Sequence, residues 1–501
     1  MTLTARIARS PGAPAALAFA FVMWGIGVPS FWRDESVSVL AARMSLGELR
    51  ELLAHIDTVH ALYYLLLRPF AALGGELAVR LPSALAVAAA TAGVTVLGRR
   101  LSAPGSWTGT YAGLVYALIP MVSRYGQEAR SYALVGAVAV AATLVLLGER
   151  RSRYVGYGLL VALLGWFHLY ALLLLPAHAL VVLRRRGEIL PWLVSLAGAA
   201  ALLAPLVYLA SGQRDEQLFW LKTPDLAALA QFGVEISGGP VSWRDAATPP
   251  LFLALLGLLT LLGAWYGSRT TVLGSRGALT AAIPGSSTAF VMPPGSRAVF
   301  ATAPVSLAAV AVPWALVPVA LSFAISQVYP VYNPRYVMFV LPALALLAGA
   351  ALASVPPRRV PVGVAVLAAL AVLSASAQLT IRGPANRPDD LRALAAELGA
   401  AERPGDAVLY MPERFWLFVS VYGGPYEKLA PFDPEAERVW LVSRRVLGAE
   451  WSSDPRLAAL KRGFVKAGPT RRSGAVRVTL YTRRLPSNHE RPPAAARARP
   501  S

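Results

Sequence analysis

Two adjacent carboxylates, Asp34 and Glu35, follow directly after the first long apolar stretch of the chain. Adjacent charges at the edge of an apolar segment cost electrostatic free energy unless a partner or a reaction uses them. At the start of a helix the two side chains point about 100° apart, so only one of them would face a central cavity. This pattern suits a general base, Asp34, that deprotonates a hydroxyl acceptor while Glu35 orients its neighbours. The alternative is a structural pair at a helix N-terminus, with Arg33 as the counter-ion.

A second polar cluster lies between two apolar segments, in the sequence Ser123–Tyr132. Its guanidinium groups have the planar fork that pairs with phosphate or carboxylate. The alternative is that arginine and tyrosine anchor helices at a membrane interface, but this role does not require the neighbouring glutamine and glutamate. We therefore expect a binding site for an anionic group here. The candidate residues are Arg124, Tyr125, Gln127, Glu128 and Arg130.

A third candidate, Arg335 with its neighbour Tyr336, precedes a later apolar segment. Arg335 is the basic residue of its loop, which suits a clamp for an anionic lipid head group. The alternative is an anchor for the segment that follows. The sequence therefore offers three polar clusters, each at the edge of an apolar run.

His60, Tyr63 and His168 are expected at the same level as these clusters. A single histidine in such a position is more often a hydrogen-bonded packing residue than a ligand. The chain has five histidines and no cysteine, and no His, Asp or Glu spacing repeats a metal-ligand pattern. The sequence thus indicates no certain cofactor. A divalent metal is compatible with it but is not indicated.

The composition places these clusters in a polytopic helical membrane protein. Of 501 residues, 56% are hydrophobic and 15% are charged, whereas a soluble domain carries about 25% charged residues. The net charge of +20 includes many arginines spaced between apolar runs of membrane length, a pattern that excludes a nucleic-acid-binding protein. A membrane span needs about 20 mostly apolar residues. The expected spans, eleven in all, are 14–31, 78–98, 107–123, 131–148, 154–167, 168–183, 189–210, 249–267, 299–325, 336–354 and 360–378.

The distribution of arginine predicts the orientation of the chain in the membrane. Segments on the side of the N-terminus contain mostly arginines, whereas segments on the other side contain slightly more acidic than basic residues. Because cytoplasmic loops are enriched in Lys and Arg, we expect a cytoplasmic N-terminus. The first apolar stretch lacks a clear cleavage site and is expected to remain as the first span. An odd number of spans then places the C-terminal part outside the cytoplasm.

Changes in composition along the chain predict its domains. Residues 1–381 form the membrane domain, with a long first outer loop at 32–77 and a mobile inner loop, rich in Gly, Ser, Thr and Pro, at 268–298. Residues 382–485 alternate short strand and helix patterns, with strands expected at 405–410, 438–443 and 477–482, and this alternation predicts a small α/β domain. The Pro/Arg/Ala-rich tail at 486–501 is expected to be disordered.

Five pieces of sequence together resemble a known family. They are the acidic pair after the first span, HALYYLLLRPF, SRYGQEARSYAL, WFHLYALLLL and NPRYVMFVLPALALLAG. They are similar to polyprenyl-phosphate-sugar-dependent glycosyltransferases of the C-type membrane fold, in particular the protein mannosyltransferase and lipid A aminoarabinose transferase group. The resemblance covers residues 14–380. The C-terminal domain is similar to the extracytoplasmic domains of these enzymes, but less specifically.

The resemblance also implies roles for individual residues. Asp34 corresponds to the catalytic base and Glu35 to the second acid of the pair. Arg335, with Arg124 or Arg130, corresponds to the arginines that hold the lipid phosphate. The chain departs from the protein mannosyltransferases because it lacks their β-trefoil insert, and because Ala61 follows His60 where those enzymes often have proline.

The function implied is transfer of a sugar from a polyprenyl-phosphate donor to an acceptor hydroxyl at the outer face of a bacterial cytoplasmic membrane. The enzyme would be a hexosyl- or pentosyltransferase, mannosyltransferase-like, with inversion at the anomeric carbon and a glycan, lipid or protein as the acceptor. Membrane lipids are its surroundings, and no nucleic acid is involved. The main alternative is a lipid or glycan transporter or flippase, for which we would expect internal repeats. A scaffold that works through its C-terminal domain would leave the acidic pair unexplained.

Overall fold

The chain divides into two compact units in a computed structural model that describes residues 10–150, 152–213, 221–269, 305–355, 360–413, 415–422, 429–444 and 453–484. Unit 1 comprises Met1–Val28 and Ser38–Asn386, and unit 2 comprises Pro29–Val37 and Arg387–Ser501. Most of the predicted inner loop at 268–298 and all of the predicted tail at 486–501 lie outside the described residues.

Unit 1 is a bundle of apolar helices, and its long members confirm a polytopic membrane protein. Within the described ranges, six helical segments are long and apolar enough to cross a membrane. They are α6 (Gly75–Arg100), η3 with α12 (Arg186–Glu188 and Ile189–Gly212), α16 (Thr248–Arg269), α17 (Leu307–Ser326), η4 with α18 (Pro334–Val340 and Leu341–Ala353) and α19 (Val360–Ile381). Shorter apolar helices are α2 (Gly12–Met23), α9 (Tyr132–Leu146), α10 (Arg153–Phe167), η2 with α11 (Leu169–Leu174 and Leu175–Leu183) and α14 (Leu226–Ile236).

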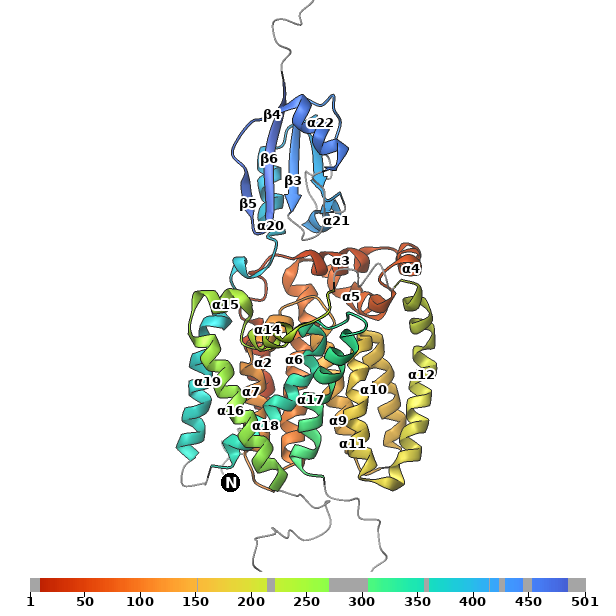
Figure 1. Cartoon of the computed structure of the whole chain (residues 1–501), viewed down its shortest axis with the longest axis vertical. Helices are drawn as coiled ribbons and strands as arrows, with labels where there is room; N and C mark the ends of the chain where they lie inside the picture. Colours follow the sequence, from red (N-terminus) through yellow and green to blue (C-terminus); the bar gives the residue numbers. More distant parts are fainter. Residues whose placement is uncertain are drawn as a thin grey trace, which may run out of the picture. The chain divides into compact units, whose positions relative to one another are not determined.

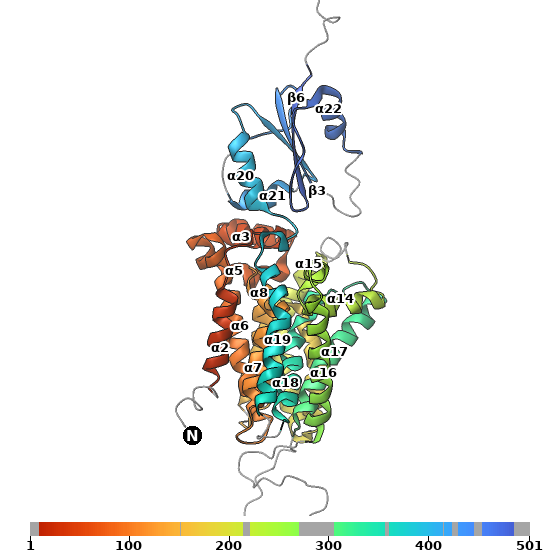
Figure 2. The same cartoon turned by 90° about the vertical axis from the view of Figure 1, so that its left-hand side faces the viewer.

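Short helices connect the apolar ones. They are α3 (Arg33–Arg43), α4 (Leu46–His55), η1 (Thr58–His60), α5 (Ala61–Leu73), α7 (Thr108–Leu118), α8 (Pro120–Gly126), α15 (Gly239–Asp245) and η6 (Pro384–Asn386). Figure 1 shows α4, α5 and α15 at one end of the bundle, and Figure 2 shows that α2 begins near the opposite end. These three short helices therefore lie at one end of the apolar helices.

The predicted span at 107–123 is interrupted in the structure. Helix α7 ends at Leu118, Ile119 is extended with ψ 117°, and Pro120 starts α8. Proline disfavours the helical conformation in the residue before it, which explains the break. As a result α8 is a separate element, and it brings the second polar cluster to the end of the bundle.

Small residues let α18 pack closely against two neighbours, α7 and α16. Gly349 of α18 lies against the backbone of Ala112 in α7, and Gly263 of α16 lies against the carbonyl of Leu347 in α18. A Cβ atom at either glycine would collide with this backbone. Backbone contacts of this kind stabilise helix pairs in a membrane, where burial of apolar surface supplies little driving force.

Unit 2 contains a mixed sheet with helices on both faces. Its strands are β1 (Ala407–Met411), β2 (Ala430–Pro431), β3 (Arg438–Arg444), β4 (Phe464–Lys466), β5 (Arg471–Ser473) and β6 (Val476–Arg483). The order is β2-β1-β3-β6-β4, with β5 also paired to β6; β1 is parallel to β2 and β3, and β6 is antiparallel to its neighbours. The strands expected near 405–410, 438–443 and 477–482 correspond to β1, β3 and β6.

The two faces of this sheet are covered by different helices. Figure 2 shows α20 (Leu391–Ala401) and α21 (Phe415–Val419) on one face and α22 (Pro455–Gly463) on the other, and a short turn η7 (Ser420–Tyr422) follows α21. Strand side chains alternate between two apolar cores: Val408 packs toward α20 and α21, whereas Leu409 packs toward α22. This alternation is the period of two expected for a sheet buried on both sides.

Candidate functional site

Arg130 is a buried charge in the turn between α8 and α9, with 8% of its surface exposed. One terminal guanidinium nitrogen donates to Ser38 Oγ in α3 at 3.3 Å, and the other lies 3.0 Å from His60 Nε2 at the end of η1. Ser83 of α6 fixes the turn itself, because its hydroxyl donates to the Glu128 carbonyl at 2.7 Å. Contacts from α3 and η1 therefore orient the guanidinium, and α6 fixes the turn that carries it.

His60 is held as a neutral acceptor for Arg130. Removal from water is the main cause that lowers its pKa well below the usual value, and the nearby Arg130, His168 and Arg335 lower the pKa further. Since guanidinium nitrogens can only donate hydrogen bonds, His60 Nε2 must accept and its proton must reside on Nδ1. Arg130, His168 and Arg335, which belong to three separate sequence motifs, are thus all close enough to His60 to lower its pKa.

An aromatic cluster positions Arg335. Its guanidinium lies 5.5 Å from the ring centre of Tyr336 and 5.9 Å from that of Tyr132, within the range of a cation–π contact. Tyr336 in turn packs against His168 at 4.9 Å and Tyr170 at 5.2 Å between ring centres. Tyr132 and Tyr170 were not among the candidate residues, although both stand in the sequence motifs that contain Arg130 and His168.

A carboxylate of a distant helix engages Arg124. Its Nη1 lies 3.5 Å from Glu235 Oε2 of α14, and both side chains are 17% exposed. Glu235 was not predicted, and no local pattern marks it, since 111 residues separate the two partners. Part of the positive charge of Arg124 is therefore compensated inside the protein.

Gln127 and Tyr125 of the second cluster make contacts within the protein. Gln127 is fully buried, and its side-chain amide donates to the carbonyls of Val22 and Trp24 at 2.7 and 2.8 Å, at the end of α2. Tyr125 packs edge-on against Tyr132 at 5.1 Å between ring centres. Both observations favour a structural contribution for these two residues.

Glu128 and Tyr63 are also enclosed by the protein. Glu128 is 1% exposed and lies in the turn that Ser83 holds, and Tyr63 of α5 is 1% exposed. A buried glutamate is unusual in an apolar bundle and requires compensation. Its charge, near Arg124, adds to the electrostatic environment of this cluster.

Asp34 and Glu35 occupy the first turn of α3 and belong to unit 2. Asp34 is half-buried, whereas Glu35 is fully buried. Negative charge in the first turn is stabilised by the helix dipole and by the backbone N–H groups that have no partner within the helix. The half-buried Asp34 is therefore the more accessible carboxylate of the pair.

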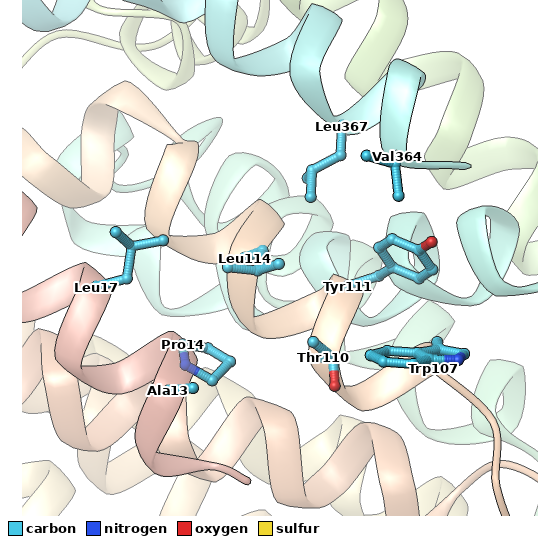
Figure 3. Close-up of a pocket in the computed structure, with 9 residues that line it drawn as sticks. All are labelled: Ala13, Pro14, Leu17, Trp107, Thr110, Tyr111, Leu114, Val364 and Leu367. Carbon is cyan, nitrogen blue, oxygen red and sulfur yellow. The ribbon is translucent and has the colours of Figure 1, made fainter. Parts of the chain in front are cut away.

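An apolar pocket of about 400 Å³ opens between α2, α7 and α19 (Figure 3). It is lined by Ala13, Pro14, Leu17, Trp107, Thr110, Tyr111, Leu114, Val364 and Leu367. These residues lie near the starts of their helices and include no carboxylate, histidine or arginine. The pocket is thus distinct from the polar clusters and offers no acid, base or anion-binding group.

Comparisons with known proteins identify the fold. The chain matches the crystal structure of ArnT from Cupriavidus metallidurans in the apo state, with a TM-score of 0.57 and 13% identity, over 93% of this chain and 97% of that one. It also matches the structure of the same protein bound to undecaprenyl phosphate, with a TM-score of 0.56, 14% identity and the same coverage. No protein-family model and no curated protein sequence matches the chain. The family resemblance seen in the sequence is therefore confirmed at the level of the fold.

Proposed function

We propose that this protein transfers a sugar from a polyprenyl-phosphate donor to an acceptor hydroxyl. The observation that carries the proposal is the grouping of Arg130 and Arg335 around His60, in a fold shared with a protein crystallised with undecaprenyl phosphate. Buried or half-buried guanidinium groups are suited to a lipid-linked phosphate because they pair with its oxygens away from bulk water. Arg335 and its aromatic neighbours are the principal phosphate-binding group in this proposal.

The reaction is a single displacement. The acceptor oxygen attacks the anomeric carbon, and the bond from that carbon to the phosphate oxygen breaks. The bonding electrons leave with the phosphate, which is released as a lipid-anchored phosphomonoester stabilised by arginine. Asp34 takes the acceptor proton, and attack from the face opposite the phosphate inverts the anomeric configuration. Glu35 orients groups next to Asp34.

The transferred sugar is a hexose or pentose, and mannose is the first candidate because the sequence motifs resemble the mannosyltransferase group. Mass spectrometry of envelope glycans and glycolipids from a deletion strain tests the function. We expect one hexose or pentose modification to disappear and its polyprenyl-phosphate precursor to accumulate. Reintroducing the gene should restore the modification. An unchanged set of envelope glycans and lipid-linked sugars would contradict the proposal.

We further propose that the N-terminus is cytoplasmic and that the reaction takes place on the outer face of the membrane. Single cysteines report this orientation cleanly, because the native chain contains none. Arg472 in β5 and Ala103 between α6 and α7 are both exposed, so each tolerates a labelled side chain. In intact spheroplasts an impermeant maleimide should label Arg472→Cys at once and Ala103→Cys only after permeabilisation. The reverse pattern would invert the proposed topology.

A further inference from the structure

The segment that carries Asp34 and Glu35 groups with the C-terminal domain, the part of unit 2 that starts at Arg387. Residues Pro29–Val37 belong to this unit by their contacts, although the rest of the N-terminal half of the chain belongs to unit 1. The contacts that join the segment to the domain connect residues far apart in sequence; Ser30 and Asp389, for example, are 359 positions apart. The proposed reaction gives these contacts no role, so they need their own explanation.

The main contact is an ion bridge centred on Asp389. Its carboxylate is fully buried and lies between two arginines: Oδ1 accepts from Arg444 Nε at 2.6 Å, and Oδ2 lies 3.2 Å from Arg33 Nε. Arg444 is the last residue of β3, and a backbone bridge joins Asp389 to Gly474 between β5 and β6. The sheet therefore fixes the carboxylate, and the carboxylate fixes Arg33.

Two further contacts hold the residues before Arg33. The Phe31 amide donates to the Tyr422 hydroxyl at 2.6 Å, and the two rings pack with centres 5.5 Å apart. The Ser30 hydroxyl donates to the Asp389 backbone carbonyl at 3.3 Å. Backbone, ring and charge contacts thus act on the three residues Ser30, Phe31 and Arg33, immediately before Asp34.

We propose that the C-terminal domain is a positioning device for the acidic pair, with Asp389 as its central positioning residue. The inference rests on the proposed function of Asp34. A buried carboxylate is stable only when it is paired, so the protein keeps the Asp389 bridge closed. Because Arg33 and Asp34 are consecutive in the first turn of α3, closing the bridge fixes the backbone from which Asp34 projects. A base displaced by about 1 Å can cost a hundredfold in rate.

Arg33→Gln in the full-length protein is the most informative variant. It removes the charged contact between the segment and Asp389 and leaves the buried Asp389–Arg444 pair intact, so the domain should fold. We expect the rate at which the missing envelope sugar reappears in the deletion strain, per folded molecule, to fall about 10- to 100-fold. Binding of undecaprenyl phosphate to the purified variant should be unchanged. Arg33→Lys should restore part of the rate because it keeps the charge.

Hydrogen–deuterium exchange gives a readout that does not depend on activity. In Arg33→Gln and in Asp389→Asn, peptides that cover residues 29–37 should exchange faster than in the wild type. A matched control is Asp406→Asn, which breaks another buried ion pair of the same domain, Arg438 with Asp406 at 3.2 Å. This control should lower the melting temperature and leave both the exchange of residues 29–37 and the rate per folded molecule unchanged.

The outcomes separate this inference from the proposed function. If Asp34→Asn abolishes transfer but Arg33→Gln transfers and exchanges like the wild type, the positioning role is wrong and the function stands. If Arg33→Gln loosens residues 29–37 and both variants transfer at the wild-type rate, the proposed function fails and the domain contact is structural only. Equal effects of Arg33→Gln and Asp406→Asn on transfer would also overturn the positioning role.

Discussion

Asp34→Asn should lower the rate of sugar transfer by about 10²–10⁴-fold, the usual contribution of a general base. The asparagine keeps the size of the side chain but cannot accept a proton at neutral pH. Because the polyprenyl phosphate is held by arginines of unit 1 in this proposal, undecaprenyl phosphate should bind to the variant as it does to the wild type. The rate is measured as the return of the missing envelope sugar after the variant is induced in the deletion strain.

Glu35→Gln is the matched comparison, because it makes the same chemical change at the adjacent position. Glu35 is fully buried and Asp34 is half-buried, so loss of the Glu35 charge should affect the thermal stability more and the transfer rate less. A purely structural acidic pair predicts a different result, in which both variants lose stability and keep their activity per folded molecule. An Asp34→Asn protein that transfers sugar at nearly the wild-type rate would remove Asp34 from the mechanism.

The sequence predicts well what depends on local patterns. Long apolar runs such as 78–98 and 249–267 form α6 and α16, because the length and composition of a span are properties of one segment. The strands of the C-terminal domain were also predicted near their positions in the structure. Residues such as Val408 and Leu409 alternate between two cores, and this alternation is a local pattern of apolar residues. The break at Pro120 was missed, although the proline itself carried the signal.

Side-chain pairings between distant segments could not be predicted from the sequence. The sequence gives no sign that Arg33 lies beside Asp389, with its Nε 3.2 Å from Oδ2. The sequence also gives no sign that Glu235 lies beside Arg124, which with Arg130 is one of two candidates for the second phosphate-binding arginine. Neither partner has a recognisable spacing, because each pair is formed by tertiary packing between elements more than a hundred residues apart. Gln127 shows the same limit, since its spacing does not indicate that its side-chain amide donates to the backbone carbonyl of Val22 in α2.

The second large effect is expected at Arg335. Arg335→Ala should weaken the binding of undecaprenyl phosphate by about 2–5 kcal/mol, the usual cost of removing one partner of a desolvated charge pair. Arg335→Lys should recover only part of this loss. Lysine keeps the charge but lacks the planar fork, and it also loses the guanidinium contact with the rings of Tyr132 and Tyr336. Titration of the detergent-solubilised protein with undecaprenyl phosphate measures both variants.

Arg124→Ala is the control for this prediction, because it removes an arginine whose charge Glu235 already compensates. Its effect on the affinity should be smaller than that of Arg335→Ala, and its main consequence should be a lower thermal stability, since Glu235 loses its ion pair. If Arg335→Ala binds undecaprenyl phosphate with the wild-type affinity while Arg124→Ala does not, the phosphate is bound at Arg124 and its pairing with Glu235 must open when the lipid binds. Loss of affinity in Arg335→Ala alone would place the phosphate against the aromatic cluster, where the fork of Arg335 is held by two tyrosine rings.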